Sequence, residues 1–333
     1  MSTTRAAAEC ANQMTADITK HTPAPPLNRV VEFLQARFPN VSDVALLHGG
    51  AWSSAFAFRS DDHQRVIRFG VFREDYDKDR VAARWHRPHL PIPEVLEIGD
   101  AFGGVYALSV RHHGEALATL PGERVRGVIG ELFHSLRAIR DIDAPGTGFG
   151  MWRAPSVAAP YDSWRAYLLD VGNRDDDRLR GWRTRMSAHA TAAAVFERGL
   201  RLLERRIDVC PQTRRIIHAD LLGNVLVASD NHVNAVFDWG NSLVGDPLYD
   251  VAWLCYCAPW YPGLDPQEVM TLAREHFDDV NLVERVTCYT LHITLGELQY
   301  VAFTGVAQDL DAAVRRADAL LEGLDRPPGT GKS

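Results

Sequence analysis

The sequence lacks the features of membrane-spanning, secreted and nucleic-acid-binding proteins. No apolar run approaches the ~20 residues that cross a bilayer, and the segment up to Pro26 lacks the apolar core of a signal peptide. The five cysteines are odd in number and form no CxxC pair, which indicates reduced thiols in a cytoplasmic protein. A net charge of −7 argues against nucleic acid as a partner and favours a cationic substrate.

Length and apolar content predict a folded protein with a mixed part followed by a helical part. The chain has 333 residues, of which 46% are hydrophobic, enough for a sizeable core. Apolar patterns predict strands at 44–47, 55–58, 65–69, 95–99 and 105–110, and helices at 29–38, 73–87, 127–139, 162–171 and 191–207. The expected organisation is an extension at 1–26, a small lobe at 27–112, a helical lobe at 113–325 and a disordered tail at 326–333.

The strongest functional signal is a set of polar residues around a predicted hairpin. Asp220 and Asn224 follow an apolar stretch, and Asp238 comes fourteen residues after Asn224. Apolar residues at 225–227 and 233–237 predict a hairpin that brings Asn224 and Asp238 to one spot. Either residue alone could equally be a turn residue. Together, a carboxylate that orients a hydroxyl and oxygens that hold Mg²⁺ against ATP phosphates indicate phosphoryl transfer.

Several segments resemble the aminoglycoside phosphotransferase family, the small-molecule branch of the protein-kinase-like fold. Besides the residues above and Trp239, the segment Gly245-Asp246-Pro247-Leu248-Tyr249-Asp250-Val251-Ala252 is similar to the family. Residues 90–99, 147–150 and 258–260 resemble its hygromycin B branch. The resemblance covers about residues 28–322. It implies an α+β, bilobal fold with a small antiparallel sheet in the first lobe and mainly helices in the second.

The resemblance also implies cofactors and residue roles. ATP is the expected phosphate donor, with GTP as the alternative, and Mg²⁺ is the expected metal. Asp220 would be catalytic, Asn224 and Asp238 would bind the metal, and His218, Asp246 and Asp250 would support the catalytic loop. The expected nucleotide-binding residues are Arg68, its carboxylate partner Asp79, Ser53 in the small-residue turn 48–54, and Ser109 and Val110 in the segment that links the lobes.

Two positions depart from the usual family pattern. Asn224 stands four residues after Asp220, one residue closer than in the family. A missing residue can displace its successors by up to ~3.5 Å if the loop does not re-form, which is more than a Mg–oxygen bond tolerates. Full activity is therefore not assured. The cation of the third strand is Arg68 rather than the lysine common in kinases, as in the hygromycin B branch.

The acceptor is expected between the catalytic loop and the late helices. Aromatic faces at Trp260 and Tyr300 can cover sugar rings, Glu297 can bind an ammonium group, and Gln299 shares its helix. For each of these residues a place in the core is an equal alternative. The resulting hypothesis is a monomeric enzyme that phosphorylates a small cationic antibiotic, hygromycin B above all.

Other functions remain open on the sequence alone. A kinase for another small alcohol, such as a macrolide, choline or methylthioribose, would share the catalytic residues and differ only in its acceptor pocket. A catalytically weak nucleotide-binding relative would explain the shortened loop after Asp220. A non-enzymatic binding module is the least favoured, because it would not explain why Asp220, Asn224 and Asp238 occur together.

Overall fold

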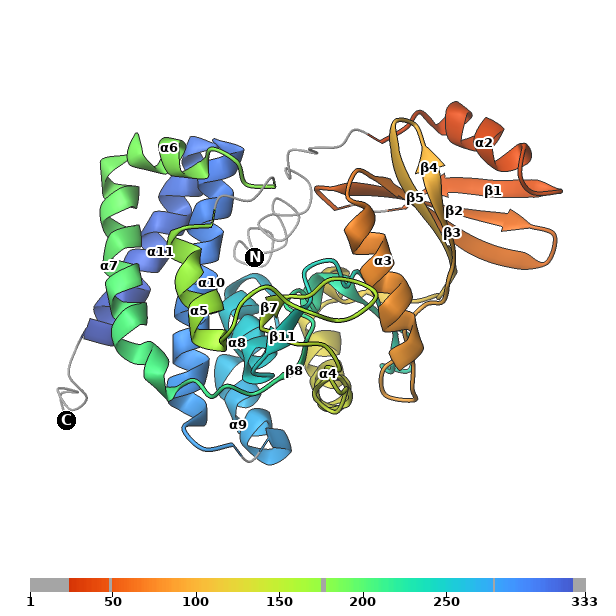
Figure 1. Ribbon diagram of the computed structural model, residues 1–333. Coiled ribbons are helices and arrows are strands. Elements are labelled where there is room, and N and C mark those ends of the chain that lie inside the picture. Colours follow the sequence, from red (N-terminus) through yellow and green to blue (C-terminus); the bar gives the residue numbers. More distant parts are fainter. Residues whose placement is uncertain (1–23, 48–49, 175–177, 278, 326–333) are drawn as a thin grey trace, which may run out of the picture.

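The structure is a computed structural model that describes residues 24–47, 50–174, 178–277 and 279–325. An antiparallel sheet with two helices occupies one end, and a mainly helical part occupies the other (Figure 1). This arrangement confirms the α+β fold class. The predicted extension lies outside the described residues up to position 23, as does the predicted tail at 326–333.

Five antiparallel strands form the sheet in the order β1-β2-β3-β5-β4. They are β1 (Val41–Leu46), β2 (Ser53–Ser60), β3 (His63–Gly70), β4 (Val95–Ala101) and β5 (Gly104–Val110). All five predicted strands are present, and each is longer than expected because backbone pairing continues past the apolar residues. Phe102 and Gly103 both have positive φ (52° and 75°), as a two-residue hairpin turn between Ala101 and Gly104 requires.

The two faces of the sheet are covered by different helices. Helix α2 (Leu27–Gln35) packs with Tyr106 and Leu108 of β5, whereas α3 (Arg73–Ala82) contributes Tyr76 to a cluster with Val105 and Ala107. Successive strand residues point to opposite faces, so one strand serves both layers. Figure 1 shows α2 and α3 on the two sides of the sheet.

Helices and two small sheets make up the rest of the chain. The helices are α4 (Gly122–Arg140), α5 (Trp164–Leu169), α6 (Trp182–Ser187), α7 (Ala190–Arg206), α8 (Leu248–Cys257), α9 (Pro266–Phe277), α10 (Leu282–Thr304) and α11 (Ala307–Asp325). One sheet has the order β10-β9-β6, with β10 (Val233–Val236), β9 (Val225–Val227) and β6 (Glu115–Ala116); the other has the order β7-β11-β8, with β7 (Gly150–Met151), β11 (Leu243–Gly245) and β8 (Arg215–Ile217).

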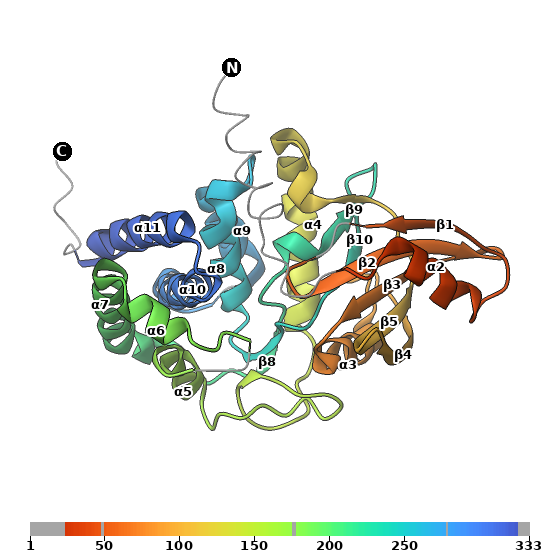
Figure 2. The ribbon, with the colours of Figure 1, turned by 90° about the horizontal axis from the view of Figure 1, so that it is seen from above.

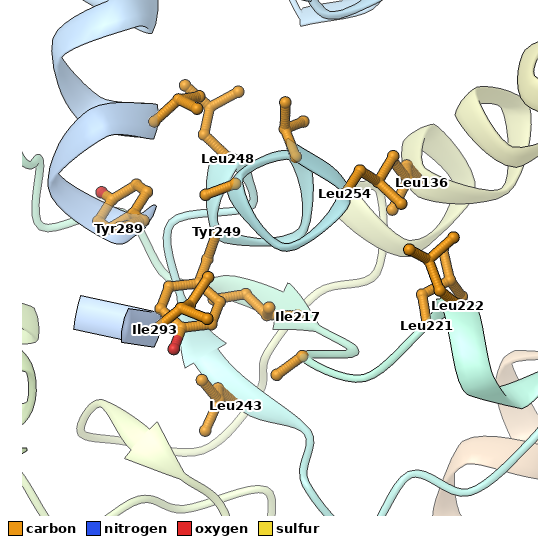
Figure 3. Packing of buried hydrophobic residues seen from close by; sticks show 14 of the residues in the cluster. Leu136, Ile217, Leu221, Leu222, Leu243, Leu248, Tyr249, Leu254, Tyr289 and Ile293 are labelled. Carbon is orange, nitrogen blue, oxygen red and sulfur yellow. The ribbon is translucent and has the colours of Figure 1, made fainter. Parts of the chain in front are cut away.

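Helix α10 lies at the centre of the helical part. It packs against α6, α7, α8 and α11, which surround it in Figure 2. Its Tyr289 and Ile293 meet Leu248 of α8 and the strand residues Ile217 and Leu243 in one buried cluster (Figure 3). Strand β8, which leads to Asp220, is therefore anchored in the main core of the protein. No helix within the described ranges is long and apolar enough to span a membrane.

A buried ion pair ties the segment before α8 to α10. The Arg285 guanidinium donates to both carboxylate oxygens of Asp246, at 2.8 and 2.6 Å, and the Tyr289 hydroxyl donates to the same carboxylate. The side chains of Asp246 and Arg285 are 0% and 4% exposed. Asp246 is therefore structural, as predicted, but its side chain binds α10 and the start of α8 rather than the loop that carries Asp220.

Candidate active site

The candidate catalytic loop, residues 218–224, is held by a buried carboxylate and a buried histidine. Asp250 of α8 accepts hydrogen bonds from the backbone N–H groups of His218 (2.9 Å) and Ala219 (2.8 Å). His218 Nε2 lies 3.1 Å from the carbonyl oxygen of Phe237, which joins this loop to the end of β10. The predicted supporting roles of His218 and Asp250 are confirmed, and both contacts fix the backbone that carries Asp220.

The predicted hairpin is present and brings the candidate metal ligands together. Strands β9 and β10 pair antiparallel, and Phe237 N donates to the Asn224 carbonyl oxygen at 3.1 Å, next to Asp238. The short loop closes as a 3-10 turn, η5 (Leu222–Asn224). In this turn Asn224 N donates to Leu221 O (2.9 Å), and Asn224 Nδ2 donates to Asp220 O (2.8 Å). The shortened loop is therefore closed by its own hydrogen bonds.

Asn224 and Asp238 present a donor set that suits Mg²⁺. The Asn224 amide nitrogen is used by Asp220, so its Oδ1 is the atom left for a ligand. Asp238 has a φ of 61°, and its side chain is 41% exposed. A non-glycine residue in the left-handed region commonly marks a functional site. Both side chains offer oxygen ligands, which Mg²⁺ prefers, so these residues could hold that ion.

Arg68 and Asp79 form the predicted ion pair. The Arg68 Nη2 atom donates to Asp79 Oδ2, while Arg68 Nη1 lies 3.9 Å from Asp238 Oδ2. The second oxygen of Asp79 accepts from the backbone N–H of Trp239 at 2.8 Å. These contacts link β3 and α3 to the segment that carries Asp238. A guanidinium fixed in this way can bind phosphate oxygens with its planar fork.

Burial strongly affects Asp220. Burial, assisted by the negative charge of Asp238, raises the pKa of Asp220 to about 7, against a lowering by hydrogen bonds from Asn241 and Asn224. The Asn241 Nδ2 atom donates to Asp220 Oδ2 at 3.2 Å. Sequence reasoning missed Asn241, although its place three residues after Asp238 is a signal that could have drawn attention to it.

Lys78 is a second residue that the sequence did not reveal. Its side chain is buried, and Nζ donates to the carbonyl oxygens of Gly240 (2.8 Å) and Ser242 (3.2 Å). Burial lowers the pKa of Lys78 to about 8. A Cβ on Gly240 would come within 2.8 Å of the Asp75 carboxyl group. Helix α3 and the segment 238–242 are therefore closely packed. In the sequence, the signal for Lys78 was its position next to the predicted nucleotide-site residue Asp79.

The remaining predicted nucleotide residues lie on the sheet. Ser53 begins β2 opposite Gly70, and Ser109 Oγ donates to the carbonyl oxygen of Val66 at 3.5 Å. The Val110 N–H is already bonded to Glu94 O at 3.0 Å, so adenine recognition in this segment would use other backbone groups. His48 and Gly49 of the predicted phosphate turn lie outside the described residues.

The predicted acceptor residues separate into two groups. Trp260 is buried, with 8% of its surface exposed, and the guanidinium of Arg316 lies over its ring, 4.7 Å from the ring centre, so the predicted contact of this ring with a sugar is corrected. Glu297 accepts from Arg316 and from the hydroxyl of Tyr256. Tyr300 is half-buried on α10, the helix that also carries Glu297. Gln299, on the same helix, does not lie in the predicted acceptor site.

Gln299 is turned into the core. Its side chain is 3% exposed, and Nε2 donates to the Val171 carbonyl oxygen at 2.6 Å. This contact joins α10 to the turn after α5 and leaves the amide no access to an acceptor. We therefore exclude Gln299 from the candidate acceptor site.

Electrostatics connects the acceptor group to the catalytic loop. Burial raises the pKa of the Cys257 thiol, and the charges of Asp220 and Glu297 add to the rise. Burial likewise raises the pKa of Tyr261, with smaller contributions from Cys257 and Asp220. The charges of both carboxylates thus act on Cys257 of α8.

Comparison with known proteins agrees with this geometry. The profile described as "Phosphotransferase enzyme family" matches residues 43–283. The chain is 30% identical over 295 residues to hygromycin-B 4-O-kinase of Escherichia coli, which covers 88% of this chain and 84% of that protein. It also matches the crystal structure of a thermostable mutant of aminoglycoside phosphotransferase APH(4)-Ia, a ternary complex with AMP-PNP and hygromycin B. That match has a TM-score of 0.79 and 30% identity, over 89% of this chain and 99% of the other.

A more distant structure shares the fold alone. Spectinomycin phosphotransferase APH(9)-Ia, in complex with ADP and spectinomycin, matches with a TM-score of 0.57 and 15% identity, over 92% of this chain and 96% of the other. The matching family profile and the 30% identical kinase confirm the resemblance seen in the sequence. The chain belongs to the phosphotransferase enzyme family, within which its relatives are aminoglycoside phosphotransferases.

Proposed function

We propose that this protein transfers the γ-phosphate of ATP to a hydroxyl group of hygromycin B or a close aminocyclitol antibiotic. The observation that carries the proposal is the position of Asp220, whose backbone carbonyl accepts from Asn224 Nδ2, at the end of the hairpin that also brings Asp238 beside Asn224. The similarity to hygromycin-B 4-O-kinase supports the acceptor, and the AMP-PNP complex of APH(4)-Ia supports an adenine nucleotide over the GTP alternative.

Positioning and charge neutralisation would provide most of the catalysis. Asp220 would accept a hydrogen bond from the acceptor hydroxyl and align its oxygen with the γ-phosphate, while Asn241 keeps the carboxylate oriented. Arg68 would bind the phosphates that are not transferred. When bound, Mg²⁺ would neutralise phosphate charge, and Asn224 and Asp238 would hold it. Burial lowers the pKa of His218 to about 4, so this imidazole stays neutral and serves as support.

Acceptor binding would combine an aromatic surface with negative charge. The half-buried ring of Tyr300 suits a sugar ring, and the carboxylates at Asp220 and Glu297 suit ammonium groups. Because two carboxylates face the acceptor in this proposal, the site would select a polycation over an uncharged alcohol. Arg316, which pairs with Glu297, neutralises part of that negative charge.

The direct test is ADP release by purified protein with a panel of acceptors. Hygromycin B should stimulate release, whereas choline, methylthioribose and a macrolide should not, and expression in a sensitive bacterium should give hygromycin resistance. Release on one of the uncharged or monocationic alcohols alone would instead identify a different small-molecule kinase. Absence of turnover on every acceptor, with intact nucleotide binding, would support the catalytically weak relative.

The shortened loop gives a prediction about metal binding. Because Asn224 already bonds to the Asp220 carbonyl, one glycine inserted after Gly223 should displace Asn224, lower kcat and raise the Mg²⁺ concentration needed for half-maximal activity. The matched control is one glycine inserted between Ser229 and Asp230, in the exposed turn of the same hairpin. Equal activity and metal dependence in both insertion variants would show that Asn224 is not a ligand.

The charge of the acceptor site gives a prediction about KM. Glu297→Gln removes the negative charge that pairs with Arg316 and that would bind an ammonium group of the acceptor. KM for hygromycin B should therefore rise more than kcat falls, because such a contact binds the ground state and the transition state alike. Wild-type kcat/KM should also fall with ionic strength. Glu322→Gln, an exposed change on α11, removes the same net charge and is the control. An equal change in KM in the two variants would assign the effect to overall charge.

A further inference from the structure

A cluster of histidines surrounds one carboxylate, apart from the residues of the candidate active site. His89 lies in the loop between η1 (Ala83–Trp85) and β4, and Glu131 and His134 lie on α4. One ligand atom from each of the three residues falls within 4.8 Å of the others. Two imidazoles and one carboxylate form a ligand set that Zn²⁺ uses in proteins.

The geometry of α4 explains why two of these groups meet. Glu131 and His134 are three residues apart and therefore share one face of the helix. His134 Nδ1 lies 3.3 Å from Glu131 Oε1, and the His134 ring lies 5.2 Å from that of His89, centre to centre. An ordinary i,i+3 surface pair would explain the first contact. It would not explain the approach of His89 from another segment.

Two further histidines extend the cluster. His232 Nδ1, from the turn between β9 and β10, lies 3.5 Å from Glu131 Oε2, on the other oxygen of the carboxylate. The His276 ring of α9 lies 5.6 Å from that of His134, and its buried Nδ1 has no hydrogen-bond partner in the described part of the chain. Four of the 13 histidines of the chain thus gather around Glu131, brought there by four separate segments.

We propose that His89, Glu131 and His134 bind a divalent transition-metal ion of the Zn²⁺ type, with His232 or water as the fourth ligand. Ligand atoms around tetrahedral Zn²⁺ lie about 3.4 Å apart, as bond lengths of ~2.1 Å require. Side-chain rotation can achieve this, because His89 and His134 are exposed and Glu131 is half-buried. The site would be distinct from the oxygen-only Asn224 and Asp238 pair in both ligands and metal preference.

Such an ion would join the segment that leads into β4 to helix α4. That segment connects the five-stranded sheet to the helical part, since Leu90 and Ile92 belong to the main core cluster. Binding to the folded state alone raises the melting temperature as the metal concentration exceeds Kd. We expect the ion to stabilise the fold without moving the candidate active-site residues Asp220, Asn224 and Asp238.

Calorimetric titration of untagged, EDTA-treated protein with ZnCl₂ tests the proposal. We expect saturable binding of one Zn²⁺ per chain, no comparable binding of Mg²⁺ or Ca²⁺, and a rise of a few degrees in melting temperature with excess Zn²⁺. His134→Ala and Glu131→Gln should each weaken Zn²⁺ binding at least ~10-fold. Because His134 is exposed and Glu131 half-buried, the metal-free variants should melt as the wild type does.

The control is His63→Ala, which removes an exposed histidine at the start of β3 and should leave Zn²⁺ binding unchanged. Zinc-edge X-ray absorption should show nitrogen and oxygen ligands with imidazole scattering and no sulfur. Sulfur ligation would place the ion at cysteines and overturn the proposal. Undetectable Zn²⁺ binding, or wild-type affinity in the His134→Ala, Glu131→Gln double variant, would overturn it as well.

Discussion

Asp220→Asn should lower kcat by at least ~10²-fold and leave nucleotide binding in place. The asparagine keeps the size and the contact with Asn241 but no longer offers a carboxylate to the acceptor hydroxyl, so the alignment and proton acceptance of the proposed mechanism are lost. The fold should be preserved, because the backbone around residue 220 is held by Asp250 rather than by the Asp220 side chain. Steady-state kinetics and a nucleotide titration measure the two effects separately.

Asp230→Asn is the matched control, since it makes the same chemical change in the exposed turn of the neighbouring hairpin. It should have kcat and KM close to wild type. Near-normal turnover in Asp220→Asn, together with a normal melting curve, would contradict the assignment of the catalytic carboxylate. A large loss of nucleotide binding would instead indicate a role for Asp220 in holding the phosphates or their metal.

Arg285→Met should lower the free energy of unfolding by about 3–5 kcal/mol. The change removes the charged partner of Asp246, whose carboxylate is 0% exposed, and leaves a buried charge with only neutral donors, the Tyr289 hydroxyl and the Leu248 backbone N–H, among the described residues. Urea unfolding followed by circular dichroism measures the difference as a lower midpoint at constant slope.

Arg165→Met provides the comparison. Arg165 pairs with Asp208 on the surface, where the two side chains are 40% and 84% exposed, so its loss should cost less than about 1 kcal/mol. A similar small effect for both variants would mean that Asp246 and Arg285 do not hold α10 against the segment before α8.

The part of the site that could be predicted from the sequence consists of residues whose neighbours are fixed locally. Asn224 and Asp238 flank a hairpin, and two apolar segments with a polar turn between them indicate that pairing from the local sequence. The five strands of the sheet were found for the same reason. The pairing of Arg68 with Asp79 came instead from the family resemblance, because nothing local joins β3 to α3.

The tertiary structure alone decided which side chains of α10 are accessible. Residues 291–295 are all buried, because the helix is surrounded by others, so helical periodicity marks no outward face. Gln299 was therefore placed in the acceptor site, although it points into the core. Similarly, Lys78 and Asn241 owe their positions to contacts between α3, the catalytic loop and residues 238–242. Such contacts join segments far apart in sequence, and only the packed fold determines them.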